Sequence, residues 1–351
     1  MSDWAPIVYR LGKIDPLPNS DFLEITTVLG EYPVILKKGQ YKEGQLVSFI
    51  PYDTVVPDID IFYFLAPPVK KNSNGDIITP SPPIGHVPQS RRTIKAKRIR
   101  DTYSEGIIVD APPGFNEGDS IIDFFGLKKR IYEEELPEKG IQNNESNPKT
   151  FNLSKYDLEG FAHYGYAFEN GEDVLITEKI EGENCSFTYA EDRLWVKSRN
   201  FFKKNEEGSH WYDVPNRLCI EEKLKEFPML AVYVELYGGI KGWKYDCQVI
   251  NGRIQRKVRI FDIFDINKKQ FLEWNKITEI AEKLDIETVP ILFHGKWNND
   301  RTLHELAEGN STIGSCVKEG WVMRSIPEQY HSRLGRKIVK LKGRDYKLIK
   351  G

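Results

Sequence analysis

Residues 177–184, TEKIEGEN, place a lysine among three glutamates and a glycine. Lys179 ends an apolar run, and Glu181 and Gly182 follow it closely. A glycine lets the backbone turn tightly or approach a ligand, so a lysine beside it can act on that ligand as a nucleophile. The lysine must first lose a proton, because its unperturbed pKa is about 10.4, and neighbouring cations, a metal or burial would have to favour the neutral amine. Taken alone, the string also fits a surface lysine in a hairpin.

Further polar residues recur in apolar strands downstream of this segment. Glu235 lies in such a strand, where a buried charge costs free energy unless it is paired. Lys340 and Lys342 alternate with apolar neighbours and therefore share one face of a strand. The downstream motifs come in the order SRN (198–200), YVELYGG (233–239), IFDIFD (260–265), KEGWVMR (318–324) and KLK (340–342). Short motifs in a fixed order are far more specific than any one of them.

This ordered set resembles the motifs of the covalent nucleotidyltransferase superfamily, which contains ATP-dependent ligases and RNA capping enzymes. KIEGEN is similar to the superfamily's lysine motif, with Glu181 where members often have Asp. Two longer stretches, RRTIKAKRIRDTYSEGIIV (91–109) and KYDLEGFAHYGYAFENGEDVLITEKIEG (155–182), also resemble the RNA ligases of family 5, the Deinococcus and Naegleria type. These enzymes carry an N-terminal OB domain and seal nicks whose 3′-OH strand is RNA. The resemblance covers nearly the whole chain.

The resemblance implies ligation in three steps through Lys179. Lys179 would attack the α-phosphorus of ATP and release pyrophosphate. AMP would then pass to the 5′-phosphate of a nick, and the 3′-OH would finally attack and release AMP. The family pattern also implies that Glu178 accepts a hydrogen bond from the adenine amine and that Glu235 binds the ribose. Phe261 would stack on adenine, with Phe264 as the second choice.

The resemblance implies phosphate and metal contacts for a second group of residues. Lys340 and Lys342 would contact the α-phosphate and lower the Lys179 pKa through like-charge repulsion. Glu319 and Glu181 would hold Mg²⁺ or Mn²⁺, in part through water. Lys155 would contact the triphosphate of ATP. Asn184 and Arg199 would position the ends of the nick.

Each assignment also has a plainer interpretation that the sequence leaves open. Phe261 fits an ordinary core aromatic, and Glu319 fits a surface ion pair. Glu178 and Glu235 fit outward-facing strand residues. A basic tail would account for the KLK lysines, a strand-end salt bridge for Arg199 and a turn-stabilising side chain for Asn184.

Composition bounds the class of protein. The chain has 351 residues, which suggests about two domains. Apolar residues make up 40% and charged residues 29%, so wholesale disorder is excluded. We find no apolar run near the roughly 18 residues of a membrane helix and expect no secretory signal. The four cysteines stand apart, which argues against a disulfide scaffold or structural zinc and fits a reducing cytosol. We expect a cytoplasmic monomer without a membrane partner.

Strand and turn patterns predict a multidomain chain, with an all-β OB-fold barrel followed by an α+β nucleotidyltransferase domain with antiparallel sheets. Residues 1–131 contain five strand-like runs, LEITTVLG, YPVILKK, QLVSFIP, RTIKAKRI and EGIIVDAP. The polar stretch 132–150 predicts a linker. Residues 151–351 contain a helical pattern at 276–286 and the strand-like runs VLITEKIEG, RLWVKSRN, AVYVELYGG, KVRIFDIFD, GWVMRSI and KIVKLKG.

Charge is unevenly distributed, although the net charge is −2. Residues 91–100 hold six cations and no acid, and residues 331–351 hold eight Lys or Arg against one acid. Such patches can neutralise phosphates through counterion release, although solvated surface would also explain them. We expect the basic strand at 91–100 to contact duplex phosphates through Arg92, Arg98 and Arg100.

These expectations together predict an ATP-dependent RNA ligase that acts on nicked duplex RNA or an RNA/DNA hybrid, with ATP and Mg²⁺ or Mn²⁺ as cofactors. A DNA nick ligase and a catalytically silent nucleic-acid-binding relative are the competing hypotheses. A silent relative would be expected to lose one or more of Lys179, Glu235, Glu319, Lys340 and Lys342, and all are present. A capping guanylyltransferase is disfavoured by the OB-first order and by Glu178.

Overall fold

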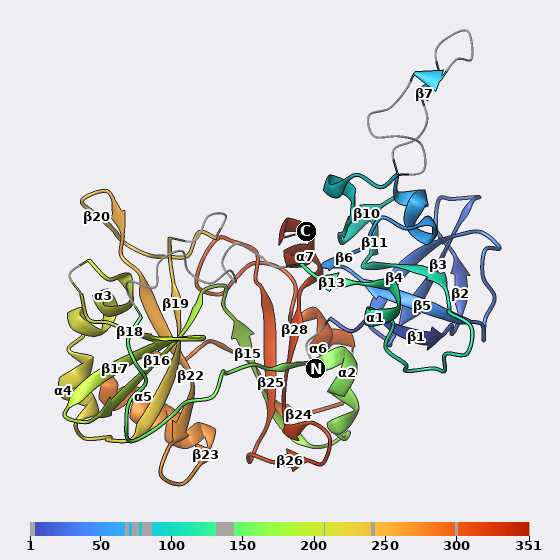
Figure 1. Ribbon diagram of the computed structural model, residues 1–351. Helices are drawn as coiled ribbons and strands as arrows, with labels where there is room; N and C mark the ends of the chain where they lie inside the picture. Colours follow the sequence, from blue (N-terminus) through green and yellow to red (C-terminus); the bar gives the residue numbers. More distant parts are fainter. Residues whose placement is uncertain are drawn as a thin grey trace. The chain divides into compact units, whose positions relative to one another are not determined.

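The chain was analysed as a computed structural model that describes residues 4–66, 70–71, 77–78, 86–130, 144–206, 208–239, 243–298 and 301–350. It divides into two compact units, Met1–Leu136 with Lys347–Gly351, and Pro137–Tyr346 (Figure 1). The linker expected at 132–150 stays a prediction, because residues 131–143 lie outside the described part of the chain. The C-terminal residues 347–351 group with the first unit, whereas the sequence pattern places them in the second.

The first unit consists of short, mostly antiparallel strands. Two sheets have the orders β1-β5-β12 and β2-β3-β4, with β1 (Ile7–Arg10), β2 (Ile14–Pro16), β3 (Leu23–Val28), β4 (Tyr32–Lys37), β5 (Leu46–Pro51) and β12 (Gly106–Asp110). Smaller sheets are β13-β6-β9, β10-β11 and β7-β8, with β6 (Thr54–Val55), β7 (Lys70–Lys71), β8 (Ile77–Ile78), β9 (Thr93–Ile94), β10 (Lys97–Ile99), β11 (Thr102–Ser104) and β13 (Lys128–Lys129). The helical turns are η1 (Asp60–Leu65), η2 (Gln89–Arg91) and α1 (Ile122–Phe125).

A buried apolar cluster fills the interior of this unit. Val8, Ile50 and Val109 come from the three strands of the first sheet, and Phe62 and Phe125 come from the helical turns η1 and α1. The aromatic rings of Phe62 and Phe125 meet edge to face with centroids 5.8 Å apart. The expected all-β N-terminal domain is confirmed, and four of its expected strand runs contain β3, β4, β5 and β12.

The single basic strand expected at 91–100 is wrong. Its first part, β9, pairs with β6, and its second part, β10, forms a separate hairpin with β11. Arg100 and Asp101 join the hairpin strands with φ values of +48° and +64°. Two positive φ values are typical of the tight two-residue turns that match strand twist. Glycine or asparagine usually marks such turns, and the sequence has neither here.

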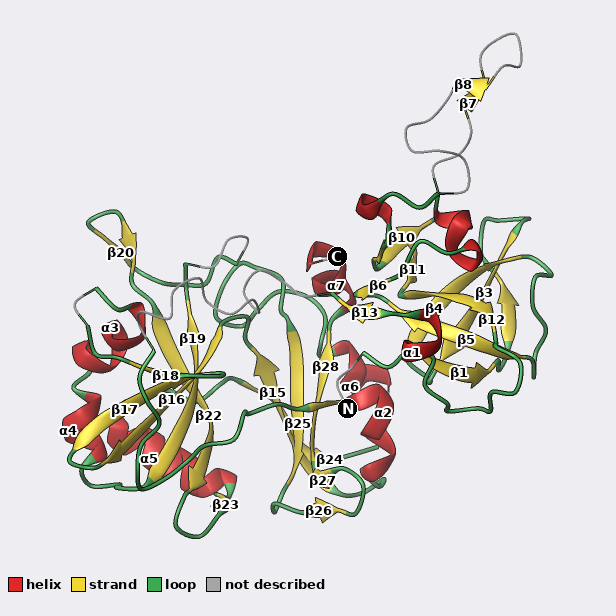
Figure 2. Cartoon of the chain, in the orientation of Figure 1, coloured by secondary structure: helices red, strands yellow, loops and turns green. Residues whose placement is uncertain are grey.

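The second unit contains two larger sheets (Figure 2). The five-stranded sheet has the order β14-β28-β25-β15-β24, with β14 (Glu159–Gly160), β15 (Asp173–Lys179), β24 (Ile291–Lys296), β25 (Gly320–Ser325) and β28 (Ile338–Lys342). The six-stranded sheet has the order β18-β17-β16-β19-β22-β23, with β16 (Glu183–Ala190), β17 (Arg193–Ser198), β18 (Phe202–Lys203), β19 (Leu230–Tyr237), β22 (Lys257–Asp265) and β23 (Gln270–Phe271). Two further hairpins are β20 (Val249–Ile250) with β21 (Arg253–Ile254), and β26 (Tyr330–His331) with β27 (Gly335–Arg336).

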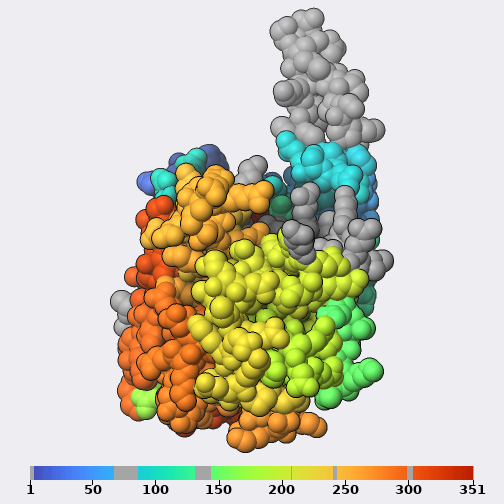
Figure 3. Space-filling model, turned by 90° about the vertical axis from the view of Figure 1, so that its left-hand side faces the viewer, coloured from blue at the N-terminus to red at the C-terminus, as the bar shows by residue number. Residues whose placement is uncertain are grey.

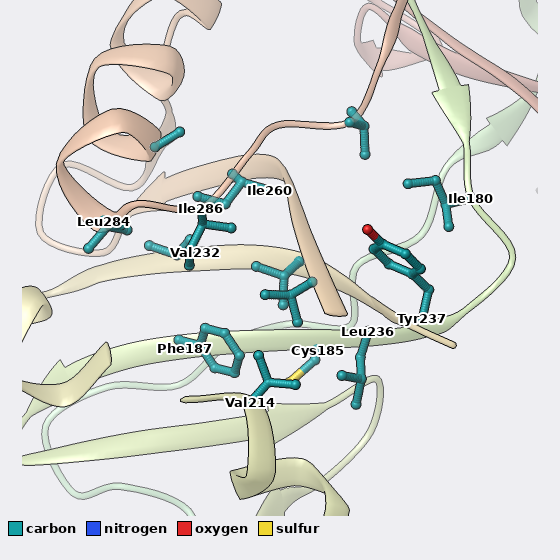
Figure 4. Packing of buried hydrophobic residues seen from close by; sticks show 14 of the residues in the cluster. Ile180, Cys185, Phe187, Val214, Val232, Leu236, Tyr237, Ile260, Leu284 and Ile286 are labelled. Atoms are coloured by element: carbon teal, nitrogen blue, oxygen red, sulfur yellow. The ribbon is translucent and has the colours of Figure 1, made fainter. Parts of the chain in front are cut away.

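Helices pack against both sheets of this unit. They are α2 (Phe161–Tyr164), η5 (Gly165–Ala167), α3 (His210–Arg217), α4 (Ile220–Leu224), α5 (Trp274–Leu284), α6 (Arg301–Glu305) and α7 (Arg344–Lys350). Val214 of α3, Leu224 of α4 and Ile277 of α5 join the buried cluster around Val232. Figure 4 shows Val214 and Val232 in this cluster, and the face of the unit that carries α3 and α4 is turned toward the viewer in Figure 3. The α+β fold is confirmed, with antiparallel pairing in both sheets apart from the parallel pair of β14 and β28. Among the described residues, no helix has the length and apolar character needed to cross a membrane.

Side chains along β15 alternate between two buried apolar clusters, one on each side of the sheet. Val174 and Ile176 point into a cluster with Trp321 and Met323. Leu175 points to the opposite side, into the cluster shared with the six-stranded sheet. Because side chains alternate along a strand, Lys179 lies on the same face of β15 as Leu175. Glu178 lies on the opposite face, with Val174 and Ile176.

Candidate active site

Lys179 lies at the end of a row that crosses three strands. It pairs with Gly320 of β25, and Gly320 pairs in turn with Lys342 of β28. A Cβ atom on Gly320 would lie 1.9 Å from the carbonyl oxygen of Leu341, and the φ of +152° disfavours any side chain. The glycine therefore lets the third strand approach, and it brings the first and last motifs of the set together. Lys340 and Lys342 share one face of β28, while Leu341 between them is buried in the opposite cluster.

The Lys179 ammonium forms an ion pair with Glu319, with Nζ 2.7 Å from the carboxylate. The side chain of Lys179 is 24% exposed and that of Glu319 only 6%. Burial alone would lower the pKa of Lys179, but the negative charges of Glu319 and Glu235 outweigh burial and raise it above 10.5. This arrangement holds the amine in its charged form, and the expected lowering of the Lys179 pKa by Lys340 and Lys342 stays a prediction.

Two further carboxylates crowd the same amine. Burial raises the pKa of Glu235 to about 8, and the charges of Glu319 and Glu181 add to the effect of burial despite the opposing charge of Lys179. Burial likewise raises the pKa of Glu319, with Lys179 opposing and Glu181 reinforcing it. Tyr346 donates its hydroxyl proton to Glu181 over 2.5 Å. The cluster thus gathers three carboxyl groups around one ammonium. Because Glu235 holds a proton at neutral pH, Glu319 and Glu181 are the groups that could attract a further cation.

Gly182 sets the position of Glu235 relative to the lysine motif. A Cβ atom on Gly182 would lie 2.7 Å from the carbonyl oxygen of Leu236 and 2.8 Å from the Glu235 side chain. The glycine therefore permits the close approach of β19, whereas the sequence suggested a tight turn or the approach of a ligand. Asn184 pairs directly with Glu235 across β16 and β19, so the amide and the carboxylate share one face of the six-stranded sheet.

Glu178 has a different partner set from the one expected. Its carboxylate is buried and accepts hydrogen bonds from the Ser311 hydroxyl at 2.5 Å and from the Thr312 amide and hydroxyl at 2.9 and 2.6 Å. Ser311 and Thr312 belong to a hairpin-like loop, closed by the Lys318 amide donating to Gly309. Glu319 follows this loop directly. The arrangement argues against the expected adenine contact and indicates that Glu178 fixes the loop before Glu319.

Phe261 is the extra residue of a β-bulge. Tyr233 and Val234 of β19 are opposed by Asp262 and Ile260 of β22, which leaves Phe261 without a direct partner. Bulges often re-aim a side chain beside an active site. The half-buried ring contacts Tyr156 and Tyr233, with centroids 5.0 and 6.2 Å away. Stacking on adenine stays a prediction, and Phe264 contacts Phe271 at 5.0 Å instead.

Asp262, beside the bulge, is the centre of a buried ion network that the motifs only hinted at. Arg336 and Arg324 pair with its carboxylate, and Tyr156 donates to it over 2.7 Å. Burial would raise the Asp262 pKa, but the charges of Arg336 and Arg324 lower it. Arg324 also donates to the Phe261 carbonyl at 2.7 Å. The network therefore ties β25 of one sheet to β22 of the other and fixes the bulge.

Three of the cations assigned to phosphates and nick ends meet at one carboxylate, Asp157. Arg199 lies 3.0 Å, Lys340 3.5 Å and Lys155 3.9 Å from its oxygens. Sequence reasoning assigned no role to Asp157, although it lies within the stretch 155–182 that carries the family resemblance. The structure thus brings Lys155, Arg199 and Lys340 together, and places Lys179, Lys342, Glu181, Glu235 and Glu319 in the neighbouring cluster.

The three arginines expected to contact duplex phosphates do not share one face of the first unit. Arg92 donates to the Val87 carbonyl at 2.8 Å and pairs with Asp58 at 3.0 Å, so it is held internally. Arg98 lies on the exposed β10 over the ring of Tyr103, at 5.5 Å. Arg100 occupies the hairpin turn and donates to the Asn19 carbonyl. A phosphate contact therefore stays a prediction that fits Arg98 best.

The carboxylate cluster was also considered as a metal site. Among the described residues, no three or more His, Cys, Asp or Glu side chains converge as a complete metal-binding set. Mg²⁺ commonly binds through one or two carboxylates together with water and substrate phosphates. The two glutamates beside Lys179, Glu319 and Glu181, fit that mode as the protein's share of the ligands.

Comparison with known families decides the class of this site. The RNA ligase family model matches residues 172–342, the span from β15 to β28 that holds Lys179, Glu235, Glu319 and the KLK lysines. Residues 172–342 are therefore similar to the RNA ligase family. An OB-fold domain model matches residues 6–79, in the first unit. A comparison with curated protein sequences found no significant match.

Solved structures share the fold of this chain across both of its units. The Naegleria gruberi RNA ligase with pyrophosphate has a TM-score of 0.75 and 20% identity, and the match covers 97% of each chain. A lysine-to-methionine variant of that enzyme with AMP and manganese has a TM-score of 0.76 and 21% identity, covering 99% of this chain and 98% of the other. A lysine-to-alanine variant with ATP and manganese has a TM-score of 0.72 and 20% identity, covering 98% and 96%. The expected OB-fold followed by an α+β domain is confirmed.

Proposed function

We propose that this chain is an ATP-dependent ligase that joins RNA 3′-OH and 5′-phosphate ends through a lysyl-AMP intermediate on Lys179. The observation that carries the proposal is the position of Lys179, whose ammonium lies 2.7 Å from Glu319, in one strand row with Lys342. The similarity of residues 172–342 to the RNA ligase family supports it. The similar Naegleria structures contain ATP, AMP, pyrophosphate and manganese, and by analogy we propose ATP with Mg²⁺ or Mn²⁺ for this chain.

In the first step, the Lys179 amine attacks the α-phosphorus of ATP. The nitrogen lone pair forms the P–N bond, and the bond to the bridging oxygen breaks, so that pyrophosphate leaves with the electron pair. The amine must be neutral, whereas Glu319 and Glu235 raise its pKa above the usual value. A divalent cation would supply charge neutralisation at these carboxylates and at the phosphates. Loss of their negative charge lowers the Lys179 pKa, and Lys342 beside the row further favours the neutral amine.

The protein's own groups account for binding and orientation. Glu235, paired with Asn184, lies where a ribose hydroxyl could be held beside the adenylated lysine. Lys340 and Lys342 share a strand face suited to the α-phosphate. Such catalysis depends mainly on positioning and electrostatics rather than on further covalent chemistry. AMP would then move to the 5′-phosphate, and attack by the 3′-OH would form the phosphodiester and release AMP.

The proposal is tested by incubating the protein with ATP labelled at the α-phosphate and Mg²⁺, and then separating denatured protein from free nucleotide at neutral or alkaline pH. We expect a labelled protein whose label is stable to alkali and lost in warm acid, as for a P–N bond, and no label on Lys179→Ala. Lys296→Ala is the matched control, because Lys296 lies on the neighbouring strand β24 and makes an exposed ion pair with Asp173. An unlabelled wild-type protein that is folded, or equal labelling of Lys179→Ala, would contradict the proposal. Labelling from GTP in place of ATP would indicate a capping enzyme.

We further propose that the substrate is a nick in duplex RNA or an RNA/DNA hybrid, sealed by a monomer in the cytoplasm. The distinguishing feature is the 2′-OH of the 3′-OH strand, which is what separates RNA from DNA. Sealing of matched nicks with an RNA or a DNA 3′-OH strand tests this part of the proposal. Equal or faster sealing of the DNA strand would favour a DNA nick ligase.

A further inference from the structure

Asp157 is the shared partner of three cations that the family resemblance assigns to the nucleotide phosphates or to the nick ends. Arg199, from the segment after β17, lies 3.0 Å from Oδ2 of Asp157. Lys340, from β28, lies 3.5 Å from Oδ1, and Lys155 lies 3.9 Å from Oδ2. These cations come from parts of the chain up to 183 residues away from Asp157. A carboxylate therefore lies where one anion meets cations from three separate segments.

The backbone on both sides holds Asp157 at this point. On one side, the Tyr156 ring packs on Tyr233 with centroids 4.9 Å apart, and its hydroxyl donates to the buried Asp262. On the other side, Glu159 and Gly160 form the parallel strand pair with β28, in which Gly160 lies opposite Lys340. The Leu158 amide donates to Asp157 at 3.0 Å. The carboxylate is thus placed by the fold and is not a freely moving surface side chain.

The carboxylate is ionised at neutral pH. Burial would raise the pKa of Asp157, but the positive charges of Lys340 and Arg199 outweigh burial and lower it. An ionised carboxylate and a phosphate oxygen present the same acceptor chemistry to guanidinium and ammonium groups. A phosphate that uses these cations must therefore compete with Asp157.

We propose that Asp157 is a positioning residue that occupies the phosphate-binding cations and is displaced from them by the substrate's phosphates. This inference rests on the proposed function, because that function assigns Lys340 to the α-phosphate of ATP. A cation paired with Asp157 is not available to a phosphate, so the affinity falls by the fraction of time that the pair is formed. Exposed ion pairs are individually weak, and 45% of the Asp157 side chain is exposed. Competition should therefore change affinity several-fold, enough to speed release of pyrophosphate without preventing ATP binding.

The test compares ATP and pyrophosphate binding by calorimetry, with Mg²⁺, in a Lys179→Ala background that prevents covalent reaction. We expect Asp157→Asn to tighten binding of both ligands by about three- to tenfold, because the competing charge is gone and the side-chain shape is kept. Asp157→Glu, which keeps the charge, should bind within about twofold of the parent. Asp173→Asn is the matched control, because Asp173 of β15 forms an exposed ion pair with Lys296 of β24 at 2.7 Å.

Unchanged or weaker ligand binding by Asp157→Asn would overturn the inference, because a purely structural ion pair predicts loss and not gain of affinity. Thermal unfolding checks that the variant is folded, and Asp157→Ser supplies a second neutral substitution if Asn is not tolerated. With Lys179 restored, the KM for ATP in lysine adenylation should fall while the rate at saturating ATP changes less. Failure of the proposed function would appear differently, as the lack of any adduct on Lys179, whereas the binding comparison needs no chemical step.

Discussion

Lys179 and Lys342 lie in one row across three neighbouring strands, with Gly320 between them. The row joins the first and last motifs of the RNA ligase region. It also explains why a glycine follows Glu319, since the strand that carries Lys342 passes over the position where a side chain would be. The proposed nucleophile and a proposed phosphate-binding cation therefore lie in one sheet, and Glu319 directly precedes its strand β25.

Substitution of Gly320 should disrupt this row. A methyl group would lie 1.9 Å from the Leu341 carbonyl oxygen, so Gly320→Ala must displace β28 and Lys342 with it. We expect a loss of stability of about 3 kcal/mol or more, in the range of severe backbone clashes, together with loss of the adenylated protein. Urea unfolding and adduct formation check this. Gly12→Ala is the control, because nothing lies within 4 Å of its Cβ position. If Gly320→Ala kept the stability and the adenylation of the parent protein, the close packing of β28 against Gly320 would be contradicted.

The raised pKa of Glu235 predicts a pH dependence of stability. The carboxyl titrates near its ordinary value of 4.5 in the unfolded chain and at about 8 in the fold, where burial is the main cause. Between these values the fold holds a proton that the unfolded chain has lost, so stability falls as pH rises from about 4.5 and levels off above about 8. The contribution is on the order of a few kcal/mol.

Urea unfolding between pH 5 and pH 9 measures this dependence. We expect Glu235→Gln to flatten the decline, because its amide does not titrate. Glu222→Gln is the control, since Glu222 is an exposed residue paired with Lys225. An equal slope in wild type and Glu235→Gln would show that Glu235 is ionised throughout this range.

Glu178 should act through the loop that it holds and not through the base. Glu178→Gln loses acceptor capacity toward Ser311 and Thr312, which should cost about 1–3 kcal/mol of stability. We expect slower adenylation, because the loop leads into Glu319, with the preference for ATP over GTP retained. Competition between labelled ATP and GTP measures the preference. If Glu178→Gln is folded but no longer prefers ATP over GTP, the result would instead support the adenine contact that the family resemblance implied.

The arginines of the OB-fold unit should separate into two kinds. Arg98→Ala should weaken binding to a nicked duplex and reduce the slope of log affinity against log salt by about 1, as expected for one phosphate contact. Arg92→Ala should leave that slope unchanged and lower thermal stability, because Arg92 already binds Asp58 and the Val87 carbonyl. Binding measured over a series of salt concentrations checks both. If Arg92→Ala lowered the salt slope of binding and Arg98→Ala did not, Arg92 would be the phosphate contact in place of Arg98.

Much of this arrangement could be predicted where the sequence signal is local. The run 257–265 corresponds to β22, and the apolar spacing of Ile277, Ile280 and Leu284 predicted the buried face of α5. Alternation on β28 placed Lys340 and Lys342 together. The same rule, applied to β15, would have separated Glu178 from Lys179, because neighbouring residues on a strand point to opposite faces.

Features that depend on distant partners could not be predicted in this way. Asp157 meets Arg199 and Lys340, which lie 42 and 183 residues away, and no local pattern marks such an encounter. The direction of the Lys179 pKa shift likewise depends on carboxylates from three strands or their ends. The hairpin that ends the basic stretch could not be predicted either, because Arg100 and Asp101 adopt positive φ values without glycine or asparagine.

The most direct test of the account is to locate the nucleotide on the protein. Wild-type protein incubated with ATP and Mg²⁺ is digested, and its peptides are analysed by mass spectrometry for a phosphoramidate-linked AMP. The account predicts one modified peptide, with AMP on Lys179, and none from Lys179→Ala. AMP on a different residue, or a folded wild-type protein that binds ATP and Mg²⁺ yet never acquires AMP, would contradict it.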